Sequence, residues 1–523
     1  MQVEEFLERS ARRFPEKTAL VFGERRLTYR QIETQCNQLA HGLMEKGVQR
    51  GDRVAVLLDT SVEAVLSIFA ILKAGAVFTV VNPAIRAEKL APIMNNSAAK
   101  VLITEGSKLA TIQSCSGNIS DLETIIVAGK KMENIADVPK RLGRWDELVS
   151  AHEGRVDAPP KLNIDADIAA LIYTSGSTGN SKGVVMSHLN MVSAATSVIQ
   201  YLENTSEDII MNVLPLSSSY GLHQVLTGFK IGGTVVLERS FTYPHAVLQR
   251  LTEERVTGLA IVPTIAAVLL QMDLDLGEYR FPYLRYITNA GAALPVEYTK
   301  RLRKLFPQTK IYLMYGLTEC KRVSYLPPDQ VDRRPTSVGK AMPNTEVYIV
   351  DELGKRLPSG EVGELVVRGS NVMKGYWRLP EETAKALKPG PVPGEQVLYT
   401  GDLFRMDERG YLYWVGRRDD IIKSRGEKVS PIEVENVLYK LEDIAMAAVI
   451  GVPDEVLGQA IKVVMTLKPG ADLTQSEVLR HCARYLESYK IPTMVEFRET
   501  MPKTAAGKID KLELAEHRAD APQ

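Results

Sequence analysis

The sequence predicts an α/β fold, followed by a β-rich segment and a small α+β unit. Two stretches, at about residues 18–81 and 168–313, alternate short apolar runs with segments of helical periodicity, a rhythm typical of largely parallel sheets covered by helices. Between about residues 338 and 414, short strands alternate with Gly, Pro and charged turns, which indicates a barrel-like subdomain. The last hundred or so residues have the size and pattern of one compact domain.

Local signals mark the elements of the first α/β stretch. The apolar run at residues 18–22 predicts a strand, and Thr28 followed by Gln31 has the spacing of a capping box. Apolar residues then recur at helical spacing, and Gly47 is expected to end that helix. The remaining elements expected here are a strand at 54–58, a helix at 62–73 and a strand at 77–81.

The later elements follow from the same signals. In the second stretch, strands are expected at 168–173, 183–186, 234–237, 258–261, 286–288 and 310–313, with a helix beginning near Ser187. The β-rich segment should hold strands at 346–350, 364–368 and 411–415. The final unit should hold a helix at 431–440, strands at 446–450 and 462–467, and a helix capped by Thr474 and Glu477. The charged turn at 417–420 is the expected boundary between a domain at 1–417 and a domain at 418–523.

Composition restricts the function classes. The 523 residues are 45% hydrophobic and 24% charged, which is ordinary for a globular protein. Lys plus Arg and Asp plus Glu number 64 each, so no basic excess calls for nucleic acid or an anionic membrane. The four cysteines have no CxxC spacing, which indicates free thiols in a reducing compartment. No signal peptide and no uncharged run of spanning length is recognised, so we expect a cytoplasmic enzyme with no integral membrane segment.

The most informative segment runs from Thr174 to Gly183. It reads Thr-Ser-Gly-Ser-Thr-Gly-Asn-Ser-Lys-Gly, after an apolar run at 168–173. Glycines let backbone N–H groups turn toward an anion, and hydroxyls with a lysine add donors, so the segment suits a polyphosphate. A plain Ser/Gly linker is the alternative. A P-loop is excluded, because there Gly-Lys-Ser/Thr opens a helix, whereas Lys182 precedes a strand-like run.

Four motifs together resemble the acyl-adenylate-forming enzymes, which include acyl-CoA synthetases, adenylation domains of peptide synthetases and beetle luciferases. The first is the 174–183 segment. The others, in chain order, are Met314-Tyr-Gly-Leu-Thr-Glu319, then Tyr399-Thr-Gly-Asp402 with Gly416–Gly426, then Pro502-Lys-Thr-Ala-Ala-Gly-Lys508. They span nearly the whole chain. The resemblance implies a large N-terminal domain and a small, mobile C-terminal domain that carries a catalytic lysine.

The resemblance also implies a two-step reaction. A carboxylate attacks the α-phosphate of ATP to give an acyl-adenylate and pyrophosphate, and a thiol then attacks the adenylate's carbonyl. Because an anion must approach a phosphate, catalysis should depend on positioning and on cations. The implied cofactors are ATP, Mg²⁺ and CoA, or the phosphopantetheine of a carrier protein.

Residue roles are carried over from the motifs. The implied catalytic residues are Lys508, which binds the carboxylate and α-phosphate, Thr318 at the α-phosphate, and Glu319, which is also the Mg²⁺ ligand. The nucleotide should be bound by Thr174, Ser175, Gly176, Ser177, Thr178, Gly179, Lys182, Gly291, Ala292, Ala293, Tyr315, Gly316, Asp402 and Arg417. Among these, Asp402 should accept from the ribose hydroxyls and Tyr315 should stack on adenine. Asp419 is the implied hinge, and Gly426 should face the pantetheine arm.

The acid pocket is expected at residues 214–222 and around 289–293. Its candidate residues are Ser218, Ser219, Tyr220, Gly221, His223, Asn289 and Ala290, and His223 either touches the acid or packs in the core. Many CoA ligases have Phe-His where this chain has serines, so an aromatic gate is not expected. Amino-acid-activating relatives usually have an Asp here, and its absence disfavours a substrate with a buried ammonium. Residues 315–351 nevertheless resemble enzymes that load carrier proteins.

The sequence leaves the acceptor open. The leading interpretation is a ligase that joins a small carboxylic acid to CoA. The alternative is a stand-alone enzyme that loads an acyl or peptidyl carrier protein. From other classes, a catalytically inactive adenylate-binding protein would not need Lys508, Asp402 and Glu319 together, and a luciferase-like oxygenase is possible on fold alone.

Overall fold

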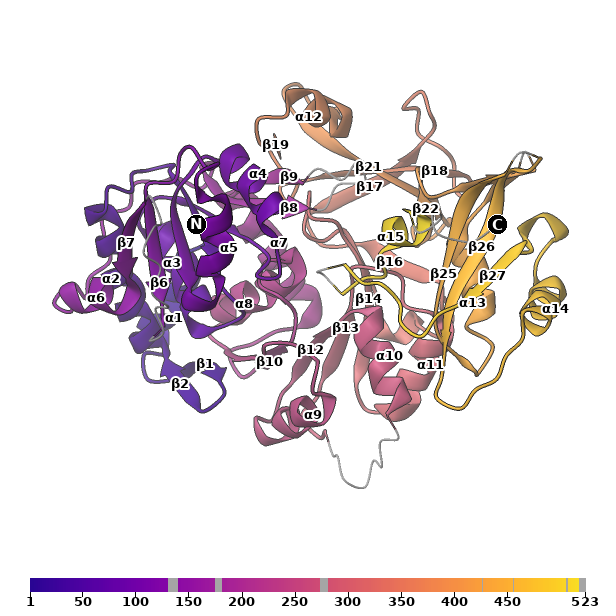
Figure 1. The fold of residues 1–523 in the computed structure, drawn as a ribbon, viewed down its shortest axis with the longest axis horizontal. Coiled ribbons are helices and arrows are strands. Elements are labelled where there is room, and N and C mark those ends of the chain that lie inside the picture. Colours follow the sequence, from indigo (N-terminus) through magenta and orange to yellow (C-terminus); the bar gives the residue numbers. More distant parts are fainter. Residues whose placement is uncertain are drawn as a thin grey trace.

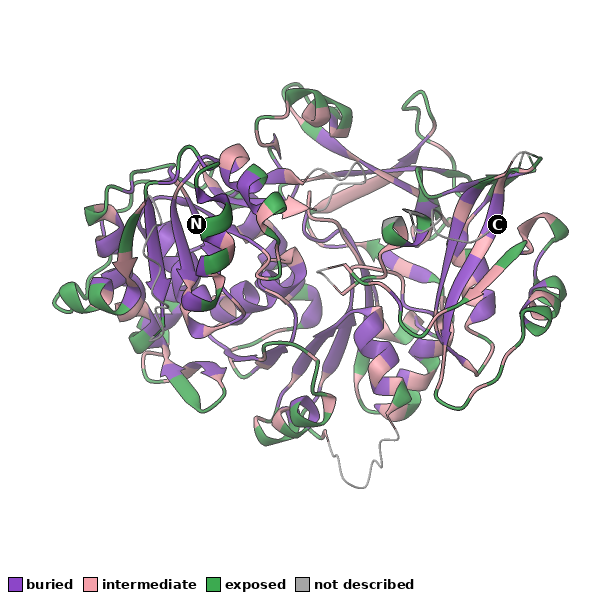
Figure 2. Ribbon diagram, viewed as in Figure 1, coloured by how far each residue is buried: buried purple, intermediate pink, exposed green. Residues whose placement is uncertain are grey.

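The computed structural model describes residues 1–129, 140–174, 181–272, 281–425, 427–454, 456–504 and 507–516. Figure 1 shows an N-terminal α/β part, a central part with strands at its core, and a C-terminal sheet on the opposite side. The described strands form three sheets. Figure 2 shows that the central strands are buried, while exposed residues gather on the outer helices and loops.

The first sheet has the strand order β19-β9-β8-β4-β3-β5-β6-β7. Pairing is parallel from β8 through β7, whereas β8–β9 and β9–β19 are antiparallel. Its strands are β3 (Arg53–Leu57), β4 (Val77–Val80), β5 (Ala99–Glu105), β6 (Thr124–Ala128), β7 (Arg141–Arg144), β8 (Ile168–Thr174), β9 (Lys182–Ser187) and β19 (Gly375–Tyr376). Lys182 is the first residue of β9, so a strand and not a P-loop helix follows it, as expected.

The second sheet contains the β-rich segment as its continuation. Its order is β17-β18-β21-β22-β16-β15-β14-β13-β12-β10-β11-β1-β2, and β20 pairs with β21. The α/β portion comprises β1 (Thr18–Phe22), β2 (Arg25–Thr28), β10 (Ile209–Asn212), β11 (Thr234–Leu237), β12 (Gly258–Ile261), β13 (Tyr286–Asn289) and β14 (Lys310–Tyr315). The β-rich portion comprises β15 (Ser324–Leu326), β16 (Ser337–Ala341), β17 (Thr345–Val350), β18 (Val362–Gly369), β20 (Leu387–Pro389), β21 (Gln396–Met406) and β22 (Leu412–Arg417).

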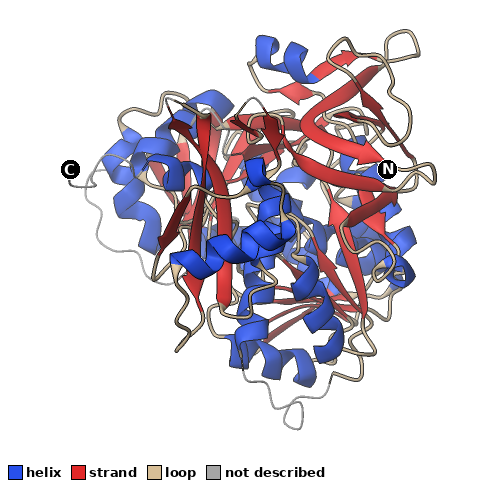
Figure 3. Cartoon of the chain, turned by 90° about the vertical axis from the view of Figure 1, so that its right-hand side faces the viewer, coloured by secondary structure: helices blue, strands red, loops and turns tan. Residues whose placement is uncertain are grey.

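The third sheet belongs to the C-terminal unit and is seen face-on, with helices before it, in Figure 3. Its strands are β23 (Ile422–Ser424), β24 (Glu427–Val429), β25 (Ile444–Asp454), β26 (Gly458–Leu467) and β27 (Met494–Phe497). The helices packed with it are α13 (Pro431–Leu438), α14 (Gln475–Tyr485) and α15 (Lys511–Glu516). Together with the two preceding sheets, this confirms the expected fold class.

Helices cover the first two sheets. They are α1 (Glu5–Arg13), α2 (Tyr29–Glu45), α3 (Val62–Lys73), α4 (Ala87–Ser97), α5 (Leu109–Ser116), α6 (Trp145–Ala151), α7 (His188–Leu202), α8 (Ser219–Ile231), α9 (Pro244–Glu253), α10 (Pro263–Gln271), α11 (Val296–Leu305) and α12 (Pro380–Ala386). The capping boxes expected at Thr28 and Thr474 both form, with reciprocal bonds to Gln31 and Glu477. In the core, Phe69 of α3 stacks on Phe229 of α8 with ring centroids 5.2 Å apart.

The topology brings the motifs to one edge of the second sheet. β12, β13 and β14 run parallel, so their carboxyl ends lie side by side. Val262 and Gly316 directly follow β12 and β14, and Gly291 is the second residue after β13. In an open α/β sheet, ligands bind beyond the carboxyl ends of the strands. The adjoining β-rich strands place Asp402 and Arg417 opposite each other on β21 and β22.

Candidate active site

Lys508 reaches this edge from the C-terminal unit. In Figure 1 the yellow segment before α15 extends toward the middle of the molecule. The hydroxyl of Thr264 donates to the carbonyl of Gly507 at 2.6 Å, which ties the segment to the start of α10. A Cβ built on Gly291 would lie 3.2 Å from Cε and 4.0 Å from Nζ of Lys508. The amine therefore lies directly over the turn after β13.

A tight local turn holds the Lys508 backbone. The N–H of Thr504 donates to the carbonyl of Lys508 at 2.7 Å, and the N–H of Lys508 donates to the Thr504 hydroxyl at 3.2 Å. Lys508 is solvent-exposed, and desolvation by the neighbouring protein together with Arg417 lowers the pKa of its amine. Asp402 and Glu319 act in the opposite direction. A lysine held this way is available to an anionic ligand.

Asp402 is the centre of a polar cluster with Tyr315 and Arg417. The Tyr315 hydroxyl donates to Oδ2 of Asp402 at 2.5 Å, and Nε of Arg417 lies 3.3 Å from Oδ1. Asp402 is 7% exposed, its Oδ1 accepts no hydrogen bond, and burial raises its pKa. Buried oxygens are normally satisfied. An unsatisfied carboxylate oxygen is suited to accept from ribose hydroxyls, so the residues present fit a nucleotide.

Glu319 lies in the turn after β14, with Thr318 beside it and Gly316 just before them. Its Oε1 accepts from the Tyr376 hydroxyl at 2.8 Å, so Tyr376 of β19 orients this carboxylate. Among the described residues, no group of three or more His, Cys, Asp or Glu side chains is arranged to hold a metal ion. Mg²⁺ usually needs only one or two carboxylates when phosphate oxygens complete its shell. Glu319 therefore fits an Mg²⁺ ion carried by ATP.

Lys182 is held by an acidic residue of α12. Its ammonium pairs with Glu382 and lies 5.4 Å from the centre of the Tyr376 ring. Thr174 ends β8 and Lys182 begins β9, and between them only Ser181 is described. The predicted loop residues Ser175, Gly176, Ser177, Thr178 and Gly179 lie outside the described residues.

Glu382→Gln is expected to lower the KM for ATP about two- to fivefold, because the carboxylate competes with phosphate for Lys182 and a partly exposed pair contributes about 0.2–1 kcal/mol. The initial rate of pyrophosphate exchange at varied ATP measures this. Glu381→Gln is the matched control, since Glu381 is exposed on the same helix and makes no ion pair with Lys182 in the described structure. An unchanged or raised KM for ATP in Glu382→Gln would contradict the competition.

The turn after β13 has an unusual backbone. Gly291 has φ +90°, a conformation that other residues rarely adopt. The side-chain amide of Asn289 donates to the carbonyl of Ala292 at 3.1 Å, while its Oδ1 has no partner. Asn289 and Ala290 are buried, and Ala292 and Ala293 are half-buried. The turn thus presents small groups beneath Lys508, as its predicted role requires.

The predicted acid-pocket segment opens α8. Ser218 caps the helix by accepting from the N–H of Gly221 at 3.0 Å, and Ser219 is its first residue. A Cβ on Gly221 would lie 2.3 Å from the carbonyl oxygen of Pro215, so glycine is required there by packing. The Tyr220 hydroxyl contacts Oγ1 of Thr288 at 2.6 Å, which links α8 to the end of β13. His223 is buried, and its Nε2 has no partner.

The expected hinge residue Asp419 lies exposed in the turn that follows β22. The N–H of Arg418 donates to the carbonyl of Gly401 at 2.9 Å. The N–H groups of Asp420 and Ile421 both donate to the backbone carbonyl of Arg417, each at 3.1 Å. Gly426, expected at the thiol channel, lies outside the described residues.

The sequence interpretation missed several residues near the site. Tyr376 and Glu382 are distant in sequence from the motifs they contact, and only the pairing of β19 with β9 reveals them. Lys321 and Arg322 were also missed, although they directly follow the Tyr315–Glu319 motif. Two consecutive cations beside a motif expected to be buried would have been the signal.

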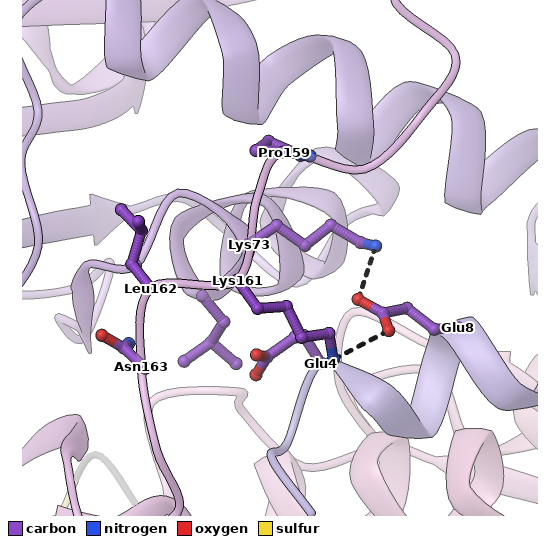
Figure 4. A pocket seen from close by; sticks show the side chains of 9 residues that line it. Glu4, Glu8, Lys73, Pro159, Lys161, Leu162 and Asn163 are labelled. Atoms are coloured by element: carbon purple, nitrogen blue, oxygen red, sulfur yellow. Dashed lines mark hydrogen bonds and ion pairs between the residues drawn. The ribbon is translucent and has the colours of Figure 1, made fainter.

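The pocket in Figure 4 lies outside this site. It is lined by Glu4, Glu8, Lys73 and Lys161 with neighbouring apolar residues, and its charged groups point toward one another. Nζ of Lys73 lies 3.2 Å from Glu8, and Nζ of Lys161 lies 3.0 Å from Glu8. Glu8 thus pairs with both lysines, which ties α1 to α3 and to the segment that carries Lys161. Across the described parts of the chain, no helix is long and apolar enough to cross a membrane.

Comparison with known proteins agrees with the class that the fold and site define, an ATP-dependent enzyme that forms an adenylate at the edge of an α/β sheet. The family model "AMP-binding enzyme" matches residues 7–377, and the model "AMP-binding enzyme C-terminal domain" matches residues 433–508. The chain belongs to this AMP-binding enzyme family and is an AMP-forming ligase of the acyl-CoA synthetase type. The predicted family and enzyme type are confirmed.

Relatives of known activity match along their whole length. A long-chain-fatty-acid–CoA ligase of Bacillus subtilis is 31% identical over 532 aligned residues, covering 98% of this chain and 93% of the relative. A feruloyl-CoA synthase of Amycolatopsis is 34% identical, covering 97% of each chain. Among solved structures, an anthranilate CoA ligase in complex with anthranoyl-AMP superimposes with a TM-score of 0.89 at 28% identity, covering 98% of this chain and 96% of that one.

Proposed function

We propose that the protein activates a small carboxylic acid with ATP as an acyl-adenylate, and then transfers the acyl group to the thiol of CoA. The observation that carries this proposal is the position of Lys508, whose amine lies over Gly291 beside the cluster of Asp402, Tyr315 and Arg417. The names of the relatives support CoA as the acceptor, since the curated relatives include CoA ligases for fatty and aryl acids.

In the first half-reaction, each group has a separate task. Asp402 accepts from the ribose hydroxyls, and Lys182 with the preceding loop binds the phosphates. The Lys508 ammonium attracts both the acid's carboxylate and the α-phosphate, which reduces the repulsion between the two anions. Glu319 would hold an Mg²⁺ ion that arrives with ATP, and this ion would supply positive charge to the phosphates. Thr318 donates to the α-phosphate, and Tyr315 packs against the adenine.

In the second half-reaction, the C-terminal unit turns about Asp419, so that Lys508 leaves and the thiol enters. The contact between Gly507 and Thr264 holds the first arrangement. The bond from the Tyr298 hydroxyl to the carbonyl of Ala445 and the packing of Tyr298 on Tyr439 also join the two parts, and the rotation has to break these contacts as well. Gly426 then faces the pantetheine arm.

The proposal predicts ATP–pyrophosphate exchange that depends on a carboxylic acid lacking a free α-amino group. Ser217, Ser218 and Ser219 offer no carboxylate to an ammonium, and a buried, unpaired ammonium is costly. Exchange measured across aliphatic, aryl and amino acids should be stimulated by the first two classes and not by proline, alanine or leucine. Stimulation by an α-amino acid alone would favour the carrier-loading alternative.

The acceptor is tested separately. Product formation with free CoA is compared with product formation on a holo-carrier protein, using the same activated acid. Thioester formed on free CoA at a rate near that of the exchange reaction supports the ligase. Thioester formed only on the carrier would show that the alternative acceptor is the physiological one.

A further inference from the structure

Two buried cations, Lys321 and Arg322, lie beside the predicted acid pocket without a charge partner. Their exposed fractions are 6% and 4%, so both are nearly removed from solvent. Nζ of Lys321 and Nε of Arg322 have no hydrogen-bond partner, and none of the described carboxylates forms an ion pair with either side chain. Lysine and arginine are seldom fully buried unless they are paired.

The surroundings of these cations supply no negative charge that would balance them. The guanidinium of Arg322 lies 4.7 Å from the centre of the Tyr220 ring, in the first turn of α8, where the end of a helix is partly positive. His223, on the same helix, is 3% exposed, and desolvation with the two cations holds its pKa well below the usual range. Desolvation and Arg322 also lower the pKa of Lys321 to about 7. Among the described residues, no carboxylate pairs with Lys321 or Arg322.

A chain of contacts connects the cations to the reacting centre. The Tyr220 hydroxyl binds Oγ1 and the carbonyl of Thr288, at 2.6 and 3.0 Å. Gly291, which lies beneath the amine of Lys508, follows Thr288 by three residues in the chain. Three residues span at most about 10 Å. These contacts place Tyr220, on which Arg322 packs, and Lys508 near the two ends of the segment from Thr288 to Gly291.

We propose that Lys321 and Arg322 form a subsite for a second anionic group on the acid substrate, so that the preferred substrate is a dicarboxylic acid. This inference rests on the proposed ligase function and names its substrate class. One carboxylate is activated beside Lys508, and the other accepts charge-assisted hydrogen bonds from the buried cations. His223 lies beside this subsite as a neutral side chain that adds no competing negative charge.

The acid pairs for the test differ only in the second carboxylate. Exchange by the wild-type enzyme is measured with butyrate and succinate, pentanoate and glutarate, and hexanoate and adipate. The dicarboxylate of at least one pair is expected to have a kcat/KM about 10- to 100-fold higher than its partner, the range of a charge-assisted hydrogen bond made in a buried site. A terminal phosphonate in place of the second carboxylate distinguishes recognition of carboxylate shape from recognition of charge alone.

Lys321→Met tests the assigned residue, because methionine keeps much of the apolar stem and removes the charge. The ratio of dicarboxylate to monocarboxylate kcat/KM should fall at least tenfold, mainly through the KM for the acid, with the KM for ATP little changed. Lys304→Met is the matched control, since Lys304 is exposed on α11. A raised KM for ATP with an unchanged acid preference would overturn the subsite and assign the cations to the nucleotide.

The failures of the two proposals are distinguishable. Monocarboxylates that stimulate exchange as well as their dicarboxylate partners would overturn the subsite while leaving the ligase function intact. An absence of exchange with every acid would overturn the ligase function, and the subsite with it. The wild-type comparison gives this result even if Lys321→Met does not fold.

Discussion

Lys508→Ala is expected to lower the rate of adenylate formation by at least about 10²–10³-fold, the usual cost of removing one preorganised charge donor. The physical reason is that the amine over Gly291 would contact both the acid and the α-phosphate, two anions that otherwise repel each other. Thioester formation from a supplied acyl-adenylate should survive, because in the proposed second half-reaction Lys508 leaves the site. Pyrophosphate exchange measures the first step, and thioester release from synthetic adenylate measures the second.

Lys503→Ala is the matched control for Lys508→Ala. Lys503 lies on the same segment, is exposed, and pairs through its backbone with Ile509, so its side chain can be removed without changing that pairing. It should keep near wild-type exchange. Equal losses of both half-reactions in Lys508→Ala would contradict the division of labour between the two arrangements.

Asp419→Pro is expected to preserve adenylate formation and to reduce thioester formation severely. Among the described residues, no acceptor binds the N–H of Asp419, so proline removes no hydrogen bond in the present arrangement. Proline fixes φ near about −65° and restricts the residue before it, which hinders the rotation that a second arrangement needs. Exchange and thioester formation are measured on the same preparation.

Asp419→Ala keeps the backbone free to rotate and serves as the control for Asp419→Pro. It should retain both half-reactions, which separates the loss of the carboxylate from the loss of backbone freedom. Full retention of thioester formation in Asp419→Pro would place the pivot elsewhere in the chain.

Local sequence signals were sufficient for the individual elements. The strands at Thr18–Phe22, Thr234–Leu237 and Gly258–Ile261 have the bounds that their apolar runs predicted, and the helix at Val62–Lys73 likewise. The capping boxes formed because their bonds join residues only three positions apart. Such features depend on neighbours in the chain, so the chain alone determines them.

Other features depended on long-range packing. The continuity of the β-rich segment with the second sheet results from the pairing of β16 with β15 and β22, strands whose order along the sheet differs from their order in the chain. The bond from Tyr315 to Asp402 joins residues 87 positions apart, and the motifs predicted only that both belong to a nucleotide site. Sheet pairing and domain closure set these distances.

The sequence by itself determined the family, the α/β class and the residues of the four motifs, because these are written in local composition and spacing. Only the tertiary structure decided that Lys508 lies over Gly291, that Glu382 holds Lys182, and that Lys321 and Arg322 are buried with no ion pair to a described carboxylate. The reason is physical: distant segments that pack around a cation decide whether it is solvated, paired with a carboxylate, or buried without an ion pair. A lysine in a printed sequence has the same charge in all three cases.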